Sequence, residues 1–541
     1  MFNKKVKMNL KKLIRNQWSY VYAGALFGLA QIIYMIGLWV QKVQQGKPAH
    51  LKPITVTTDL GKMFRGMEVF VNQLFGFKSE LYGTYGTTVV DGVQKVVPSS
   101  DGAFVPGIGW PIVGMIIGGY LVAKMERESR SWAYYNKKML LASFIGGILF
   151  SYGTRLAGGC TLNHLMGGVP MMNIHSLVTV IFMALGGILS FYIMGKFKLA
   201  NYFKHQETLS YVKSADKGEQ ATYKPGYKPL KNPYYLVGLL FVLLLIFVAI
   251  YNGFFNADSM QHLKAGHLHP FNKSVAHEGW FYVLVTLLAG IIGGIGLAKS
   301  GFGTECALVA LETGKDMTQR DKKYAFLGVP KITRTLMRSY APFIGLATHW
   351  VVMLGFIIIA WVFFGAEPAF AGKVKYSLTA GSLIGGLLLG MGAVLLIGCE
   401  IRSYMRLGMG YLNTLIGFMG FAVGYLPFTL FYKAHKHFLS STVIAGKNGS
   451  LTDKYKVYEL FTDNVTGQQI ILFIWWLIIL FLLFYFIKQG IKNTGLKKVI
   501  LIHQSTEEAQ EFIDKEATKN KGVVNGVPAP IPVPPDAYPE N

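Results

Sequence analysis

The residues of this chain best suited to chemistry are its three cysteines, each of which follows a glycine at the end of a long apolar run. They are Cys160, Cys306 and Cys399. A neutral thiol is a weak hydrogen-bond donor and a soft acceptor. A single buried cysteine is usually a small packing residue. Three of them at comparable breaks in apolar segments predict a series of sites along one path instead.

Positive charge lies close to two of these cysteines. Arg155 precedes Cys160, and Arg402 and Arg406 follow Cys399. An arginine inside a membrane is costly and usually functional, so these side chains are candidates for holding an anion. For Arg155 the alternative is equally open: an arginine that snorkels to the interface or is structurally paired.

Other polar residues near the cysteines have narrower predicted roles. Thr161 and Asn163 could cap a helix that begins after Cys160, and we expect His164 to line the path or to cap. One cysteine and one histidine do not fill a tetrahedral zinc site, so we expect neither a metal nor a cofactor here. Because neighbours on a helix do not share a face, we expect Glu400 to point away from the path.

The composition defines the elements that must position these side chains. The chain has 541 residues, of which 52% are hydrophobic and only 15% charged, with a mean hydropathy of +0.37. Apolar runs near the roughly 20 residues that a helix needs to cross a bilayer recur along it. The sequence therefore predicts an all-α polytopic membrane protein. The ten predicted spans are 19–40, 105–124, 139–159, 174–195, 233–255, 279–300, 341–364, 377–398, 411–432 and 469–487.

Basic residues predict the orientation of these spans. The net charge of +25 is concentrated in alternate connecting segments, and by the positive-inside rule those segments lie in the cytoplasm. Both termini, the basic segment 1–18 and the polar, proline-rich tail 488–541, are then cytoplasmic. These loops account for the positive charge, so we expect no nucleic-acid partner. We expect membrane lipid to surround the protein.

The ten spans divide into two membrane repeats of five, 19–255 and 279–487. The third span of each half ends in glycine, cysteine and a polar turn, at Cys160 and at Cys399. An odd number of spans per repeat inverts the second half, which is a common transporter design with interrupted helices near the midplane. We therefore expect short re-entrant helices around a central pore, with Val69 at the position of a fourth thiol. The outer segment 41–104 and the cytoplasmic loop 196–232 are insertions in the first half.

The glycine–cysteine motifs resemble those of the YeeE/YedE sulphur-transport family, over most of residues 105–490. The resemblance implies a bacterial inner-membrane protein that imports thiosulfate or a related sulphur anion and is not an enzyme. It also implies that Cys160, Cys306 and Cys399 conduct the anion, and that a small cytoplasmic sulphur-carrier protein is a partner. Sulfite, sulfide, a persulfide or a selenium analogue remain open as substrates. The motifs are Gly-Gly-Cys160-Thr-x-x-His164, Gly301-Phe-Gly-x-x-Cys306 and Gly-Cys399-x-x-Arg402.

Two other functions are compatible with a membrane protein that carries thiols. A membrane thiol-disulfide oxidoreductase would need a close reactive pair, whereas these cysteines are far apart in the sequence. A scaffold subunit of a sulphur-metabolism complex would leave the recurring glycine–cysteine motifs unexplained. In a transporter, each site must bind the anion strongly enough to compensate for its lost hydration and weakly enough to release it. Several weak thiol sites in series meet both conditions, so they favour a transporter.

Overall fold

The computed structural model describes the membrane part of the chain and short stretches beside it. Cys306, Val69, most of the segment 41–104, the loops 197–232 and 301–339 and the tail from 505 lie outside the described residues. The described residues are 17–44, 50–57, 59–61, 63–64, 67, 85–90, 93–98, 108–125, 137–196, 233–254, 279–300, 340–368, 377–396, 398–445, 456–494 and 503–504.

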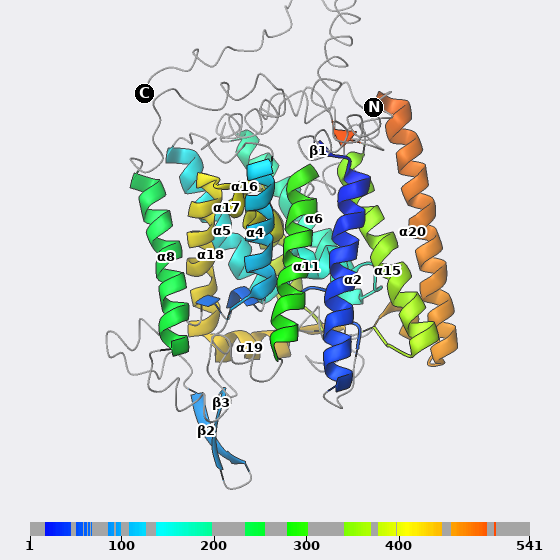
Figure 1. The fold of residues 1–541 in the computed structure, drawn as a ribbon, viewed down its shortest axis with the longest axis horizontal. Coiled ribbons are helices and arrows are strands. Elements are labelled where there is room, and N and C mark those ends of the chain that lie inside the picture. The colour runs from blue at the N-terminus through cyan, green and yellow to red at the C-terminus, as the bar shows by residue number, and fades with distance from the viewer. Residues whose placement is uncertain are drawn as a thin grey trace, which may run out of the picture.

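A long helix occupies each of the ten predicted spans, and these helices stand roughly side by side (Figure 1). A helix satisfies all of its backbone groups internally, which lipid requires. Six of the described apolar helices are long enough to cross a membrane. The ten helices are α2 (Tyr20–Gln44), α4 (Trp110–Met125), α5 (Lys137–Leu156), α6 (Ile174–Lys196), α8 (Pro233–Phe254), α11 (Gly279–Ser300), α15 (Ala341–Phe364), α16 (Ala380–Leu396), α18 (Leu412–Leu430) and α20 (Val465–Thr494).

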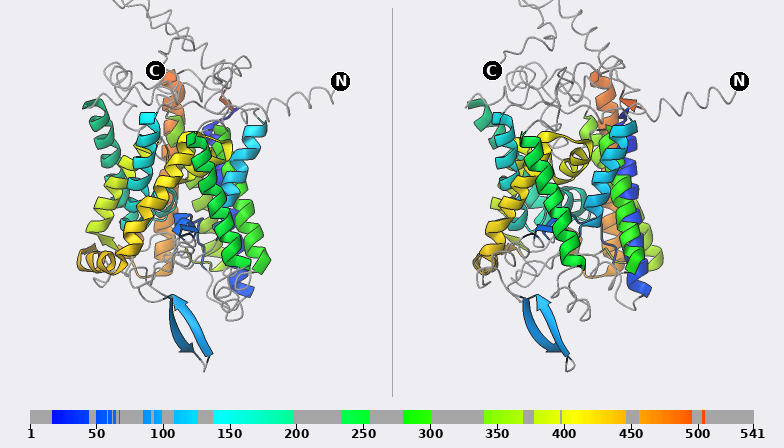
Figure 2. Two further views of the ribbon diagram at one scale, coloured as in Figure 1. Left: turned by 90° about the vertical axis from the view of Figure 1, so that its left-hand side faces the viewer. Right: turned by 60° about the vertical axis from the view of Figure 1, so that its left-hand side comes forward.

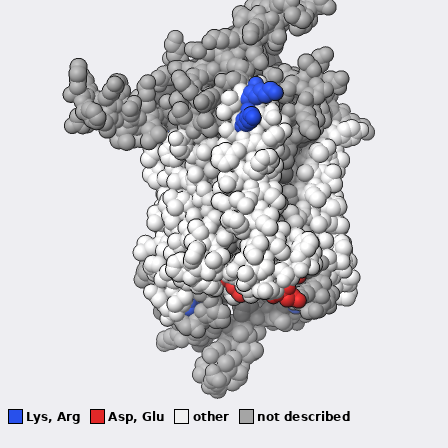
Figure 3. All heavy atoms as spheres, turned by 90° about the vertical axis from the view of Figure 1, so that its right-hand side faces the viewer, with Lys and Arg blue, Asp and Glu red and all other residues white. Residues whose placement is uncertain are grey.

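The outer wall of the bundle is apolar. Figure 3 shows one face with a broad band free of Lys, Arg, Asp and Glu, which appear only toward its two ends. Large apolar side chains point outward from this wall, among them Phe363 at 75% exposure and Phe481 at 68%. Exposed apolar area of this extent is stable against lipid and not against water. The chain is therefore a membrane protein, as its composition predicts.

Glycines bring the helices into close contact. A Cβ added at Gly153 or Gly385 would meet the backbone of the facing helix, so α5 and α16 pack backbone to backbone. The same holds where Gly114 of α4 faces Gly290 of α11. Small residues are the usual means of helix association in lipid, where apolar burial supplies no driving force.

Contacts between the long helices form matching sets, in which helices of residues 20–196 pack against helices of residues 279–430. α2 packs against both α11 and α15, and α11 packs against both α2 and α4. In the same way, α5 packs against α16 and α18, and α16 against α5 and α6. Exchanging α2 with α11, α4 with α15, α5 with α16 and α6 with α18 therefore reproduces these contacts. Figure 2 shows the arrangement from two further sides.

Within the described residues, four short helices and three two-stranded sheets add to the helical fold. β1 and β6 are antiparallel partners, so the chain just before α2 meets the chain that follows α20. The short elements are η2 (Leu162–Gly168), α17 (Glu400–Met409), α19 (Tyr432–Ser441), η5 (Val457–Leu460), and the sheets β1–β6 (Gln17–Trp18, His503–Gln504), β2–β3 (Tyr85–Val90, Val93–Pro98) and β4–β5 (Leu378–Thr379, Val443–Ala445).

Candidate functional site

Cys160 lies at a break between α5 and the short helix η2. Gly158 has a φ of 71°, and the Gly159 amide donates to the Thr154 carbonyl at 3.1 Å, which ends α5. A left-handed residue at a helix C-terminus is usually glycine because it has no Cβ. Gly159 is needed for space, since an added Cβ would lie 2.8 Å from Cβ of Asn163. The two glycines therefore set the position of the thiol.

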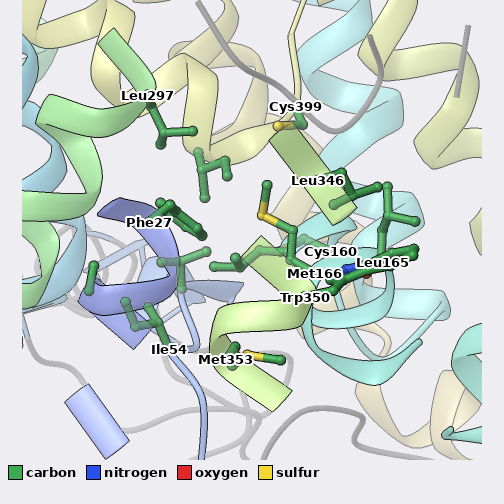
Figure 4. Packing of buried hydrophobic residues seen from close by; sticks show 14 of the residues in the cluster. Phe27, Ile54, Cys160, Leu165, Met166, Leu297, Leu346, Trp350, Met353 and Cys399 are labelled. Carbon is green, nitrogen blue, oxygen red and sulfur yellow. The ribbon is translucent and has the colours of Figure 1, made fainter. Parts of the chain in front are cut away.

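Cys399 lies at the matching break between α16 and the short helix α17. The Gly398 amide donates to the carbonyl of Ala393 at 3.0 Å, and the carbonyl of Cys399 accepts from the amide of Ser403 at 2.9 Å. Cys399 is thus the residue immediately before the first turn of α17. Cys160 and Cys399 are both outside any disulfide and have no exposed surface, and Figure 4 shows them in one buried cluster with Phe27, Met166 and Trp350.

The thiol of Cys160 belongs to a polar network inside this cluster. Cys160 Sγ donates to Asn163 Oδ1 at 3.0 Å, and the hydroxyl of Thr57 lies 3.0 Å from the same oxygen. Thr57 precedes α4 in the sequence and reaches the site through an extended segment. That segment is held by Gln31 of α2, whose Oε1 accepts from the Ile54 amide at 2.7 Å. Asn163 therefore joins the thiol to a separate part of the chain.

Glu400 is also part of the network, which corrects the prediction that it points away from the path. It is 1% exposed, and its Oε1 accepts from the Tyr404 hydroxyl at 2.5 Å. Its Oε2 lies 3.4 Å from the Thr57 hydroxyl, and its carboxyl group interacts with the Cys160 thiol. The prediction was based on the neighbouring Cys399, whereas the side chain of Glu400 faces Cys160.

Arg155 is a structurally held arginine and does not snorkel. Its side chain is 6% exposed, Nη2 donates to the Thr57 carbonyl at 2.5 Å, and its guanidinium lies 5.5 Å from the ring centre of Tyr425. It also acts electrostatically on Glu400. A positive charge is therefore fixed near the carboxyl group of Glu400, in the network that also holds the Cys160 thiol.

His164 and Thr161 are both buried on the Cys160 side of the site. Nδ1 of His164 lies 3.2 Å from the Ser176 hydroxyl, and the rings of His164 and His175 are 5.1 Å apart. Thr161 occupies the N-cap position of η2 but makes no capping bond, and its hydroxyl has no partner among the described residues. The predicted cap is wrong, because Thr161 already has helical dihedral angles and Asn163 is engaged by Cys160 and Thr57.

The two arginines of α17 differ in their surroundings. Arg406 is 6% exposed, and its guanidinium lies 5.6 Å from the ring centre of Tyr411. Arg402 is partly exposed, with side-chain carbons 3.5 Å from a Cβ added at Gly398. The described contacts therefore bring Arg155, Cys160 and Glu400 together, while Arg406 stacks at the far end of α17. Cys306 lies outside the described residues.

Sequence reasoning missed Thr57, and the site also contains Tyr404. Tyr404 follows Glu400 by four residues, which places both on one face of α17, and that spacing was a usable signal. Thr57 has no such signal, because only the packing of the 50–57 segment brings it to the site. Among the described residues no three His, Cys, Asp or Glu side chains are grouped as a metal site would require.

These features define a helical multi-pass membrane protein with buried thiols, a buried arginine and a buried carboxyl group at paired helix breaks. Comparison with known proteins finds a match over part of the chain: residues 2–189 match the family described as sulphur transport. The resemblance found from the motifs is thereby confirmed for the part of the chain that contains Cys160.

Two curated relatives are both named thiosulfate transporter TsuA. The protein of Spirochaeta thermophila is 36% identical over 78 residues, which are 14% of this chain and 24% of the relative. The Escherichia coli K12 protein is 26% identical over 106 residues, which are 20% of this chain and 30% of the relative. The matched regions thus span less than a third of either relative.

Proposed function

We propose that the chain is a transporter, not an enzyme, that moves a small sulphur anion across the membrane, with thiosulfate as its first candidate. The observation that carries the proposal is the network at a break between helices, in which Asn163 and Thr57 link Cys160, a buried free thiol, to Arg155. The match to the sulphur-transport family and the names of the relatives support the substrate class.

The chemistry of the site suits such an anion. A thiol S–H can donate weakly to the terminal sulphur of thiosulfate, and several weak sites in series allow both binding and release. Arg155 supplies a positive charge in a low-dielectric interior, where it attracts an anion more strongly than it would in water. In this proposal Cys160, Cys306 and Cys399 are successive binding sites, and His164, Thr161, Arg402 and Arg406 line the path or its approaches.

The proposed path runs between two inverted five-helix repeats, 19–255 and 279–487. The exchange of α2 with α11 and of α5 with α16 that reproduces the helix contacts is what a two-fold axis would produce. The short helices η2 and α17, which begin beside Cys160 and Cys399, are then the re-entrant pair. The first residues of α17 would present free amide groups to an anion.

The proposed orientation places both termini in the cytoplasm of a bacterium, with the protein in the inner membrane. The antiparallel pairing of Gln17–Trp18 with His503–Gln504 supports a common side for the two ends. The loops 196–232 and 301–338 would then be available to a small sulphur-carrier protein.

Uptake of labelled thiosulfate tests the proposal. Cells that lack other thiosulfate importers would express the wild type, Cys160→Ser, Cys306→Ser or Cys399→Ser, at matched membrane levels. We expect uptake by the wild type and a loss of tenfold or more in each variant, because a hydroxyl does not replace a soft thiol. Lys124→Met, at the end of α4, is the control that should retain uptake. Normal uptake by all three cysteine variants would overturn the thiol path. Quinone-dependent disulfide formation without uptake would indicate an oxidoreductase.

A further inference from the structure

Glu400 is a buried acid at a site that is proposed to bind an anion. We propose that Glu400 takes up one proton when the anion binds and releases it when the anion leaves, so that anion and proton cross the membrane together. This inference rests on the proposed function and adds the coupling ion to it.

The first argument is a count of hydrogens in the network. The Thr57 hydroxyl carries one hydrogen, and it lies 3.0 Å from Asn163 Oδ1 and 3.4 Å from Glu400 Oε2. When that hydrogen is donated to Asn163, the contact between Thr57 and Glu400 is a hydrogen bond only if Glu400 Oε2 carries a proton. When Glu400 is ionised, Thr57 can turn its hydrogen to the carboxylate. The hydroxyl therefore accommodates both protonation states of Glu400 without any movement of the backbone.

The second argument is the charge balance around Arg155. Without the anion, the positive charge of Arg155 favours the ionised form of Glu400, and the two charges of such a pair offset each other. An anion that binds beside Arg155 and Cys160 would face the carboxylate at short range. Two like charges in one buried site cannot both remain ionised cheaply. Thiosulfate does not bind a proton readily, so the proton goes to Glu400.

The groups that surround Glu400 fit this role. Cys160 and Arg155 face it from the chain around the end of α5, and Tyr404 from its own helix. Tyr404 donates to Oε1, so Oε2 is the oxygen available for the proton.

Lysines on the other helices that pack against α17 lie against aromatic rings. Lys124 of α4 lies over Tyr120, and Lys299 of α11 lies over Trp18. On α17 itself, Arg406 lies over Tyr411. Within the described residues, Arg155 is the cation found to act on Glu400, so it is the one that we expect the anion to share with Glu400.

The anion and the proton each favour the binding of the other, and both are released on the far side of the membrane. If the bound anion favours protonation of Glu400, then a protonated Glu400 favours the anion by the same factor. The proton enters from the aqueous side that supplies the anion and leaves on the opposite side with it. One proton with one dianion carries a net charge of −1. At zero membrane potential, one pH unit, acid on the supplying side, should then hold the anion about tenfold more concentrated on the other side.

The test is transport in proteoliposomes that contain the full chain, labelled thiosulfate outside and a pH-sensitive dye inside, with potassium and valinomycin holding the potential at zero. For the wild type we expect an inward thiosulfate gradient to acidify the lumen, and an imposed pH gradient to drive accumulation. Glu400→Gln should still equilibrate thiosulfate down its gradient but lose the acidification and the response to pH. Glu400→Asp should retain both, at a lower rate.

The outcomes separate the two proposals. No uptake by the wild type overturns the proposed function, and the coupling with it. Uptake by the wild type without luminal acidification overturns the coupling alone. Acidification that persists in Glu400→Gln assigns the proton to another group and overturns the role of Glu400. If Glu400→Gln does not fold, luminal acidification by the wild type still tests whether a proton is cotransported. A shift in the pH dependence of acidification in Glu400→Asp then tests whether Glu400 carries that proton, and an unchanged pH dependence would overturn that role.

Discussion

Arg155 donates from Nη2 to the main-chain carbonyl of Thr57 at 2.5 Å, which ties the end of α5 to the 50–57 segment inside the protein. The bond aims a fixed charge at the network of Cys160 and Glu400 and satisfies a buried carbonyl group. Three predictions concern this arrangement, and a fourth concerns a buried lysine elsewhere in the chain.

Arg155→Lys should lower thiosulfate uptake by tenfold or more although it keeps the charge. A planar guanidinium can donate to Thr57 while stacking on Tyr425, whereas an ammonium group is a compact charge on a flexible chain. Labelled uptake at matched expression measures the effect. Uptake by Arg155→Lys equal to that of the wild type would show that charge alone is sufficient.

Thr57→Val should reduce uptake and destabilise the protein by about 1 to 2 kcal/mol, because valine has the same shape but leaves Asn163 and Glu400 without the hydroxyl. Thr55→Val is the matched control: Thr55 is also buried, and its side chain makes no hydrogen bond within the described part of the chain. Thermal unfolding in detergent and uptake would be compared for the two variants. Equal effects would mean that the loss is general to this segment.

Gly159→Ala should destabilise the break after α5 by about 1 to 3 kcal/mol, since the added methyl group would overpack a filled interior. It would lie 2.8 Å from Cβ of Asn163 and 3.0 Å from Nε2 of His164. At Gly187 of α6 the nearest contact would be 3.8 Å, to Val394. We expect Gly187→Ala to be neutral. The melting temperatures of the two variants measure the difference, and a similar fall in both would refute the steric explanation.

Lys456, just before η5, should make stability depend on pH. Burial lowers the pKa of Lys456 from its ordinary 10.5 to about 8, and Nζ donates to the Pro368 carbonyl at 3.2 Å. Between about pH 8 and 10.5 the unfolded chain binds more protons than the folded chain, so this lysine makes stability rise with pH. The rise should reach about 2 kcal/mol by pH 9.5.

Lys456→Met should remove that rise. Melting temperatures at pH 7 and pH 9.5 for the wild type and the variant isolate it, because the other titrating groups are common to both proteins. An identical pH dependence in the two proteins would exclude Lys456 as its source.

Much of the fold was predictable because lipid imposes simple constraints on sequence. A helix is the element that satisfies its own backbone in hydrocarbon, so apolar runs of sufficient length indicated the helices directly. Cys160 and Cys399 could be placed at breaks because glycine stands before each of them. The small strands, such as Leu378–Thr379 with Val443–Ala445, were not predicted, since two or three residues carry no periodic signal.

The error at Glu400 has a physical cause. Positions on one helix determine which residues share a face with each other, and from this Glu400 was correctly separated from Cys399. They do not determine which side chains from another part of the chain approach that face. Glu400 meets Cys160 and Thr57, which lie far from it in the sequence.

The sequence by itself determined that this is a helical membrane protein with glycine–cysteine breaks, because hydropathy and glycine act locally. Tertiary structure alone decided that Arg155 binds Thr57 and that Asn163, Thr57 and Glu400 form one network around the Cys160 thiol. Those contacts join residues far apart in the chain, and they form only when helices from both halves pack closely enough to exclude water and leave each buried polar group to find a partner within the protein.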